Sequence, residues 1–322
     1  MVRVASIYAP IQEELTQVEE TLQAIKRVDF AELSEMLDHV LASGGKMIRP
    51  SIALLAGKFS NNHQDRLVPL AASIELLHTA TLVHDDVIDR ASTRRGRPTV
   101  NSLFDNSASV MLGDYMFAHA ADLAARTGNL EAMRLFSRTL LAMARGELEQ
   151  DMTAYDYSQT TRQYFQRIAS KTASLFAAAA EGGAIVSTAP DAWRSALRDY
   201  GESVGMAFQI VDDILDFSGD EAEMGKPVGC DLLQGTLTLP SLLLMDRHPR
   251  DNPVRRFFQH RRSPRYLGEA VEMVLNSGIV DECYRVAGDF RDRARAALEA
   301  LPAGTTRDSL AEIADYVLER RA

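Results

Sequence analysis

Two short acidic clusters are the residues of this sequence best suited to chemistry. They are "DDVID", with Asp85, Asp86 and Asp89, and "DDILD", with Asp212, Asp213 and Asp216. In each cluster the first and third aspartates share a helix face, and the residues between them are apolar. Such carboxylates repel one another unless cations lie between them, and oxygen-only ligands suit Mg²⁺ bound together with substrate phosphates. The clusters therefore predict a magnesium–diphosphate site, against the alternative of two unrelated acidic helix ends in solvent.

Several basic residues could complete this site. They are Lys46 and Arg49 in "GGKMIRP", Arg94 and Arg95 in "STRRGRP", Lys171 in "SKTASLF", and Lys226 in a glycine-rich segment. A lone basic side chain is usually solvated, but together they indicate two anion sites, one bridged to the aspartates by metal and one held by cations alone. A rough charge count for a diphosphate between the two clusters calls for about three Mg²⁺. A diphosphate neutralised in this way is a good leaving group.

The elements that must position these residues are helical. Apolar residues recur at three-and-four spacing along most of the chain, and alternating strand patterns are scarce, so we predict an all-α protein. The segments 67–87 and 176–186 are apolar nearly all round, which places them inside a bundle. We expect long breaks over 219–235 and 248–265, the first a lid because it is glycine-rich and charged. We see no linker and expect a single domain over 1–322.

Composition limits the classes of partner. The chain has 322 residues, 46% of them hydrophobic, and a net charge of −10, which argues against nucleic acid or an anionic membrane as the main partner. Two distant cysteines, an acidic N-terminal region and the lack of an uncharged apolar run of about 20 residues favour a soluble, cytoplasmic protein. The basic stretch 247–265 is interpreted as a solvated loop, with transient membrane contact for product release as the alternative.

The order and spacing of the motifs resemble those of the trans-isoprenyl diphosphate synthases, over essentially the whole chain. The motifs are "GGKMIRP", "ELLHTATLVHDDVIDRASTRRGRPT", "GD" at 113–114, "SKTASLF", "FQIVDDILDF", "GKPVGCDLLQGTLTLP" and "IADYVLERR". The resemblance implies the isoprenoid synthase fold, a large orthogonal helical bundle with a deep central cavity, normally as a homodimer. It also implies ionisation of an allylic diphosphate, attack by isopentenyl diphosphate, and loss of a proton.

The resemblance assigns roles to residues at matching motif positions. The principal metal ligands would be Asp85, Asp89 and Asp212, supported by Asp86, Asp213 and Asp216. The allylic diphosphate would be bound by Arg94, Lys171, Thr172, Gln209 and Lys226, and isopentenyl diphosphate by Lys46, Arg49, His78 and Arg95. Thr236 departs from the pattern, because short-chain members commonly have lysine there, and this puts one allylic-site cation in doubt. The segment "CDLLQGTLTLP" lies closer to long-chain members.

The length of the product depends on the space that the side chains leave for the growing prenyl chain. A helix rises about 5.4 Å per turn, which is about the length of one isoprene unit. Each helix turn before Asp85 therefore lies about one isoprene unit deeper in the predicted product tunnel. The first turn presents Ala80 and Thr81, where short-chain members typically have an aromatic ring, and the next presents Leu77 and Ile74. The tunnel is therefore predicted to be open past the farnesyl length. Phe136 is a candidate floor, with an ordinary core phenylalanine as the alternative.

We therefore expect a product between hexaprenyl and decaprenyl diphosphate, the range of quinone side chains. A short-chain (farnesyl or geranylgeranyl) synthase and the catalytic subunit of a heteromeric synthase remain alternatives. A terpene cyclase would leave "GGKMIRP" and "RRGRP" without a role, and a non-catalytic subunit usually lacks one or both aspartate clusters.

Overall fold

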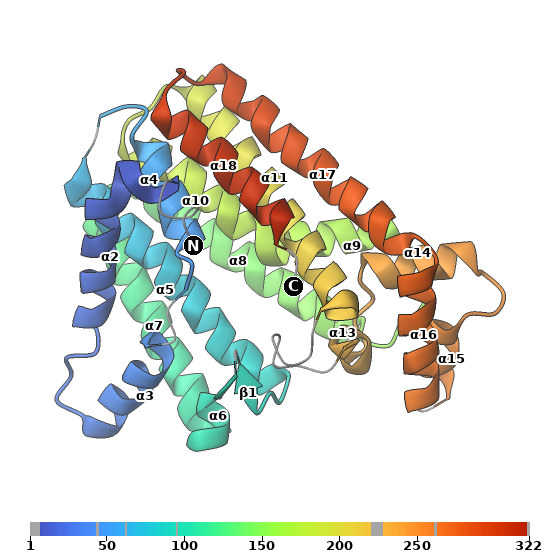
Figure 1. The fold of residues 1–322 in the computed structure, drawn as a ribbon. Helices are drawn as coiled ribbons and strands as arrows, with labels where there is room; N and C mark the ends of the chain where they lie inside the picture. Colours follow the sequence, from blue (N-terminus) through green and yellow to red (C-terminus); the bar gives the residue numbers. More distant parts are fainter. Residues whose placement is uncertain are drawn as a thin grey trace. The chain divides into compact units, whose positions relative to one another are not determined.

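The protein is almost entirely helical, which confirms the predicted all-α class (Figure 1). The computed structural model describes residues 7–42, 45–61, 63–94, 96–219, 228–260 and 263–320. Within these ranges the only β-structure is a ribbon of two strands, β1 (Thr93–Arg94) and β2 (Arg97–Pro98), which pair antiparallel.

The chain divides into two compact units. Unit 1 comprises Met1–Leu140, Leu175–Gly201 and Arg295–Ile313, and unit 2 comprises Leu141–Ser174, Glu202–Ala294 and Ala314–Ala322. Four long helices belong partly to each unit: α8 (Leu130–Met152), α11 (Asp191–Ser218), α17 (Ile279–Ala297) and α18 (Thr305–Glu319). The single domain expected from the sequence stays a prediction.

Unit 1 holds the N-terminal helices and the ribbon. Its other elements are η1 (Ala9–Ile11), α2 (Gln12–Ala24), α3 (Ala31–Leu41), α4 (Ile48–Gly57), α5 (Gln64–Ile88), α6 (Val100–Leu103), α7 (Asn106–Arg126), nearly all of α10 (Ser174–Val186), and η3 (Leu298–Ala300). Unit 2 holds α9 (Thr161–Ile168), the π-helical turn η2 (Ala169–Ala173), α13 (Cys230–Gln234), α14 (Leu239–Arg247), α15 (Pro253–Gln259) and α16 (Pro264–Asn276).

Helix α5, which ends in the first acidic cluster, lies side by side with α7 (Figure 1). The Ser73 hydroxyl donates to the Ala120 carbonyl (2.7 Å), and His84 Nε2 donates to the Val110 carbonyl (2.9 Å). Gly113 makes the approach possible, since a Cβ there would lie 2.1 Å from His84 Nε2. The glycine of the "GD" motif therefore serves the packing that holds α5 in place.

A buried carboxylate joins α2 to α4 and α5. Glu14 is 3% exposed and accepts hydrogen bonds from Lys58 and from Gln64 Nε2, the latter at 2.9 Å. Burial raises the pKa of Glu14, but these hydrogen bonds outweigh it and the net pKa is lowered. A lowered pKa means that the ionised carboxylate stabilises the fold above the carboxyl's ordinary pKa, and that this stabilisation is lost as pH falls through the folded-state value.

We predict that Glu14→Gln lowers the free energy of unfolding by about 2 kcal/mol at pH 7, because it leaves the half-buried Lys58 ammonium without its charge partner. The difference from wild type should begin to shrink as the pH falls below the ordinary carboxyl pKa, and it should disappear only below the lowered folded-state pKa, where the wild-type side chain is also protonated. Urea unfolding at pH 7 and at a series of acidic pH values below the ordinary carboxyl pKa measures both. Glu13→Gln, on the exposed face of the same helix, is the control, and equal effects of the two variants would contradict the prediction.

Unit 2 has a continuous apolar core beneath the second acidic cluster. Its largest fully buried side chains include Tyr164 of α9, Phe217 of α11 and Phe257 of α15. The sequence interpretation was wrong about 248–265, because this expected break contains helix α15. Asn252 caps that helix by accepting from the Arg255 amide (2.8 Å), and Pro253 follows at its first turn. The expected break at 219–235 likewise contains the short helix α13.

By length and composition α5 is apolar enough to cross a membrane, but 61% of its most apolar window is buried inside the protein. Core helices of soluble proteins pass the same test, so the observation is weak evidence for a span.

Candidate active site

The first acidic cluster lies at the C-terminal end of α5, in unit 1. Asp85 and Asp86 are in the last turn, and Asp89 is the residue after the helix. Asp85 and Asp89 are half-buried, whereas Asp86 is only 7% exposed. The helix therefore presents the first and third carboxylates and buries the second, and the division into principal and supporting ligands stays a prediction.

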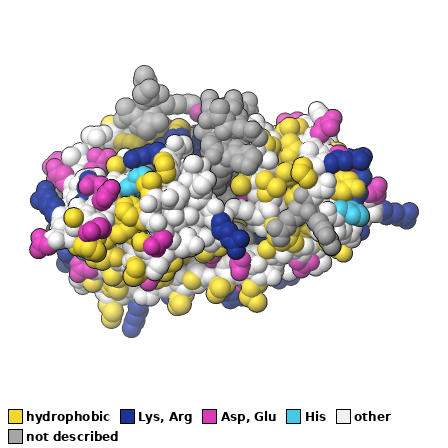
Figure 2. Space-filling model, turned by 90° about the horizontal axis from the view of Figure 1, so that it is seen from below, with side chains coloured by type: hydrophobic (Ala, Val, Ile, Leu, Met, Phe, Trp, Pro, Cys, Tyr) yellow, Lys and Arg dark blue, Asp and Glu magenta, His cyan; other side chains and the backbone are white. Residues whose placement is uncertain are grey.

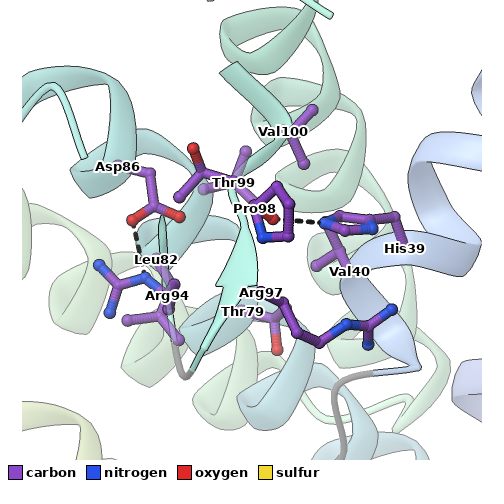
Figure 3. A pocket seen from close by; sticks show the side chains of 11 residues that line it. His39, Val40, Thr79, Leu82, Asp86, Arg94, Arg97, Pro98, Thr99 and Val100 are labelled. Atoms are coloured by element: carbon purple, nitrogen blue, oxygen red, sulfur yellow. Dashed lines mark hydrogen bonds and ion pairs between the residues drawn. The ribbon is translucent and has the colours of Figure 1, made fainter. Parts of the chain in front are cut away.

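Asp86 is held by a basic residue of the ribbon. Arg94 Nε donates to Asp86 Oδ1 at 2.7 Å, because the strand β1 turns back beside the end of α5 (Figure 3). Both side chains line a small cavity of about 60 Å³. The same strand pairing sets Arg94 opposite Arg97, and the carbonyl of Pro98 accepts from His39 (2.7 Å). The structure thus brings Arg94 to the first cluster, while Arg95 lies outside the described residues.

Two of the residues predicted to bind isopentenyl diphosphate, Lys46 and Arg49, lie at the start of α4. Lys46 is exposed just before this helix, and the Arg49 guanidinium lies 4.2 Å from the centroid of the buried Phe176 ring. His78 lines a second cavity, of about 220 Å³, together with both chain neighbours of Lys46, Gly45 and Met47. Unit 1 therefore places Lys46, Arg49 and His78 in one neighbourhood, which is consistent with a shared anion site.

The four residues predicted to set product length all belong to unit 1. Ala80 and Leu77 are buried, with 0% and 1% of their surface exposed, Phe136 is 8% exposed, and Thr81 is half-buried. Ala80 lies seven positions from Ser73 and four from His84, so the three share the helix face that packs on α7. Burial of Phe136 agrees with a core residue and with a tunnel floor alike, so its role stays a prediction.

The second acidic cluster, near the C-terminal end of α11 in unit 2, repeats the burial pattern of the first. Asp212 and Asp216 are half-buried, and Asp213 is 3% exposed. Asp212 forms an ion pair with Arg320 at 3.0 Å, and the Arg320 guanidinium lies 4.4 Å from the centroid of the Phe208 ring. Asp216 Oδ2 accepts from the Asp231 amide (3.3 Å), which ties the cluster to α13.

Asp213 is the centre of a buried hydrogen-bond network. The Tyr164 hydroxyl donates to Asp213 Oδ2 (2.6 Å), and Gln209 Nε2 donates to Oδ1 (2.8 Å). Gln209 in turn accepts from the Thr172 hydroxyl (2.7 Å). Burial, with a smaller contribution from the charge of Asp231, raises the pKa of Asp213 to about 8. Of the residues predicted for the allylic site, Gln209 is thus bonded directly to the acidic motif, and Thr172 is linked to it through Gln209.

Of the two lysines predicted to bind the allylic diphosphate, the structure describes one. Lys171 lies in η2 and pairs with Glu147 of α8 (Nζ–Oε2, 2.5 Å). Lys226 lies outside the described residues. Thr236, which replaces the lysine of short-chain members, is 9% exposed, and its amide donates to the Asp231 carbonyl (2.8 Å).

Sequence reasoning missed the partners of the predicted residues. Tyr164 and Glu147 carry no motif signal that we recognised. Arg320 belongs to the motif "IADYVLERR", but only the structure reveals its ion pair with Asp212.

The donor set of each cluster fits Mg²⁺ by its chemistry, since only oxygens are offered and two carboxylates per cluster are half-buried. Among the described residues no group of three His, Cys, Asp or Glu side chains is arranged as a complete metal site. Magnesium normally keeps several waters and binds substrate phosphates, so an incomplete protein ligand set is compatible with it. A shared pocket between the two clusters stays a prediction, since they belong to different units.

Comparisons with known proteins concern the chain as a whole. A family model described as "Polyprenyl synthetase" matches residues 30–274. Component 2 of heptaprenyl diphosphate synthase from Bacillus subtilis is 37% identical, covering 98% of this chain and 90% of that protein. All-trans-nonaprenyl-diphosphate synthase (geranyl-diphosphate specific) from Rhodobacter capsulatus is 36% identical, covering 98% and 97%.

Among solved structures, a polyprenyl synthase from Caulobacter crescentus, complexed with calcium and isoprenyl diphosphate, is 35% identical with a TM-score of 0.94. The match covers 99% of this chain and 98% of that one. This likeness also shows that the all-α fold is that of the isoprenyl diphosphate synthases. Together, the family model and the near-complete coverage of relatives above 30% identity establish that the chain belongs to the polyprenyl synthetase family.

Proposed function

We propose that this protein is a trans-polyprenyl diphosphate synthase that adds isopentenyl diphosphate units head-to-tail to an allylic diphosphate primer. The observation that carries the proposal is the pair of acidic clusters with the same burial pattern, each with basic residues beside it. A terpene cyclase would not need the second group of cations at the start of α4, because it has no second diphosphate to bind.

We assign the following roles to the side chains. Asp85, Asp89 and Asp212 bind the metal, and Arg94, Lys171, Thr172 and Gln209 orient the allylic diphosphate, with Lys226 in the same role. Lys46, Arg49, His78 and Arg95 bind isopentenyl diphosphate. Bound cations meet the charge that develops on the leaving diphosphate oxygen, and this favours ionisation. The proton lost at the end goes to an oxygen of the departed diphosphate, and we assign no side chain as its base.

Magnesium is the metal we propose, with about three ions per active site when substrate is bound. When bound, Mg²⁺ acts as a Lewis acid on the diphosphate oxygens and orients them. The calcium and isoprenyl diphosphate in the solved relative support a divalent cation together with a diphosphate at this kind of site.

A long product, between hexaprenyl and decaprenyl diphosphate, agrees with relatives named for heptaprenyl and nonaprenyl diphosphate. The small side chains Ala80 and Thr81, one turn before Asp85, support it from the sequence. A short-chain product is the less favoured alternative.

The experiment that tests the function is mass analysis of products made from isopentenyl diphosphate and farnesyl diphosphate with Mg²⁺. We expect a long prenyl diphosphate, and no product when isopentenyl diphosphate is omitted. Turnover of farnesyl diphosphate without isopentenyl diphosphate would favour a cyclase. No turnover by the single chain, with turnover restored by a second polypeptide, would favour a heteromeric enzyme.

We propose a homodimer, which light scattering during gel filtration measures directly. The Bacillus subtilis relative is named as component 2 of its enzyme, so a heteromeric assembly is the competing outcome. We also propose a cytoplasmic location, for which the two distant cysteines of the sequence are the main support.

The basic stretch 247–265 carries several ion pairs, which weakens a role in membrane contact. Arg247 pairs with Glu282, Arg256 with Asp251 at 3.2 Å, and Arg265 with Glu269 at 2.9 Å. Figure 2 shows basic and acidic side chains interspersed on the face it draws, and not one basic patch. This favours the solvated interpretation of the stretch.

A further inference from the structure

Lys171 lies in an unusual piece of backbone. The turn η2 (Ala169–Ala173) is π-helical, and the Ser174 amide donates to the Ala169 carbonyl five residues earlier. Such turns are rare and occur frequently at functional sites, because the extra residue re-aims the side chains around it. Here the turn carries Lys171 and Thr172 together.

Helix α8 lies directly against this turn. A Cβ on Gly146 would be 2.8 Å from the Lys171 amide nitrogen and 3.1 Å from its Cα. These are backbone atoms that cannot rotate away, so any larger residue at 146 would push the π-helical turn off α8. The absence of a side chain at 146 therefore sets where the Lys171 backbone lies.

The next residue of α8 contacts the Lys171 side chain. Nζ lies 2.5 Å from Glu147 Oε2, and the two side chains are 28% and 20% exposed. An ion pair on the same helix, Arg145 with Glu149, has a similar length of 2.8 Å, but its side chains are 78% and 43% exposed. Because solvent screens the exposed pair far more, the Glu147 pair is the stronger restraint.

We propose that Glu147 is a positioning residue for the reaction: with Gly146 it holds the Lys171 ammonium where the allylic diphosphate must bind. This inference rests on the proposed function of Lys171. A free lysine side chain loses rotamer entropy when it is fixed, and a side chain already ordered by Glu147 loses less of this freedom when the diphosphate binds. The diphosphate carries more charge than one carboxylate, so the ammonium can be shared with it on binding.

The test is a double-mutant cycle with a matched control. We expect Glu147→Gln to lower kcat/KM for farnesyl diphosphate about tenfold and to leave KM for isopentenyl diphosphate unchanged. Glu149→Gln, the same substitution in the exposed pair, should stay within about twofold of wild type. In a Lys171→Gln background, Glu147→Gln should add no more than about a twofold loss, because the group it positions is gone.

Calorimetric binding of inorganic pyrophosphate with Mg²⁺ provides a readout without turnover, and we expect about tenfold weaker binding for Glu147→Gln. If Glu147 had a purely structural role, Glu147→Gln would lower kcat/KM by the same factor in the Lys171→Gln background as in wild type. This result would overturn the inference. So would equal behaviour of Glu147→Gln and Glu149→Gln in an active enzyme. Wild-type protein that makes no prenyl product would overturn the proposed function instead.

Discussion

Asp212→Ala should lower the rate of isopentenyl diphosphate incorporation by about 10³-fold or more, and Asp85→Ala should have an effect of the same order. Each change removes a proposed metal ligand, and metal stabilisation of a developing anion is worth several kcal/mol, with every 1.36 kcal/mol changing the rate tenfold. The measurement is the initial rate with saturating Mg²⁺ and both substrates. Calorimetric Mg²⁺ binding in the presence of pyrophosphate should weaken in the same variants.

Two controls separate the loss of a metal ligand from other effects of Asp212→Ala. The substitution also breaks the ion pair with Arg320, so Arg320→Gln tests that contact alone and should have a much smaller effect. Asp199→Ala removes an exposed acid from the same helix α11 and should leave the rate within about twofold of wild type. Wild-type activity that survives a chelator, or an Asp212→Ala rate close to that of Asp199→Ala, would refute the metal role.

The sequence could predict the parts of the site that are formed by residues close together along the chain. The acidic clusters are signals within one helix turn, and the apolar residues around them indicated which helices are buried. Asp86 and Arg94 are also close in sequence, so a short ribbon brings them together. These parts of the candidate site, and the all-α class, were therefore accessible from residue types and spacing.

Contacts between distant helices were not accessible in the same way. Tyr164 meets Asp213 across 49 residues, and Glu147 of α8 meets Lys171, which lies beyond α9 in η2. No spacing rule predicts such pairs, because they follow from which helix faces pack together. The π-helical turn η2 was missed for a related reason: its residues have ordinary helical periodicity, and only the approach of α8 at Gly146 reveals the altered backbone.

The structure also distinguishes two substitutions that looked equivalent in the sequence. Ala80 and Thr81 are adjacent, and both lie in the turn where short-chain members typically have an aromatic ring. Ala80, however, is completely buried on the face of α5 that packs on α7, so Ala80→Phe should also overpack that contact and destabilise the protein by about 1–3 kcal/mol. Thr81 is half-buried and lies one turn before Asp85, on nearly the same side of the helix.

Thr81→Phe is therefore the sharper test of how product length is set. We expect it to shift the main product from the long-chain range towards farnesyl or geranylgeranyl diphosphate, because a ring one turn below the metal-binding carboxylate blocks the tunnel after about one further isoprene unit. Chromatography of the dephosphorylated products measures the shift. Thr79→Phe is the contrasting variant: Thr79 is also half-buried on α5, but it lines the cavities that contain Asp86, Arg94 and His78, so this variant should lower the rate without shortening the product. If both variants keep the wild-type product length, the floor of the tunnel lies elsewhere, and Phe136→Ala becomes the variant expected to lengthen the product.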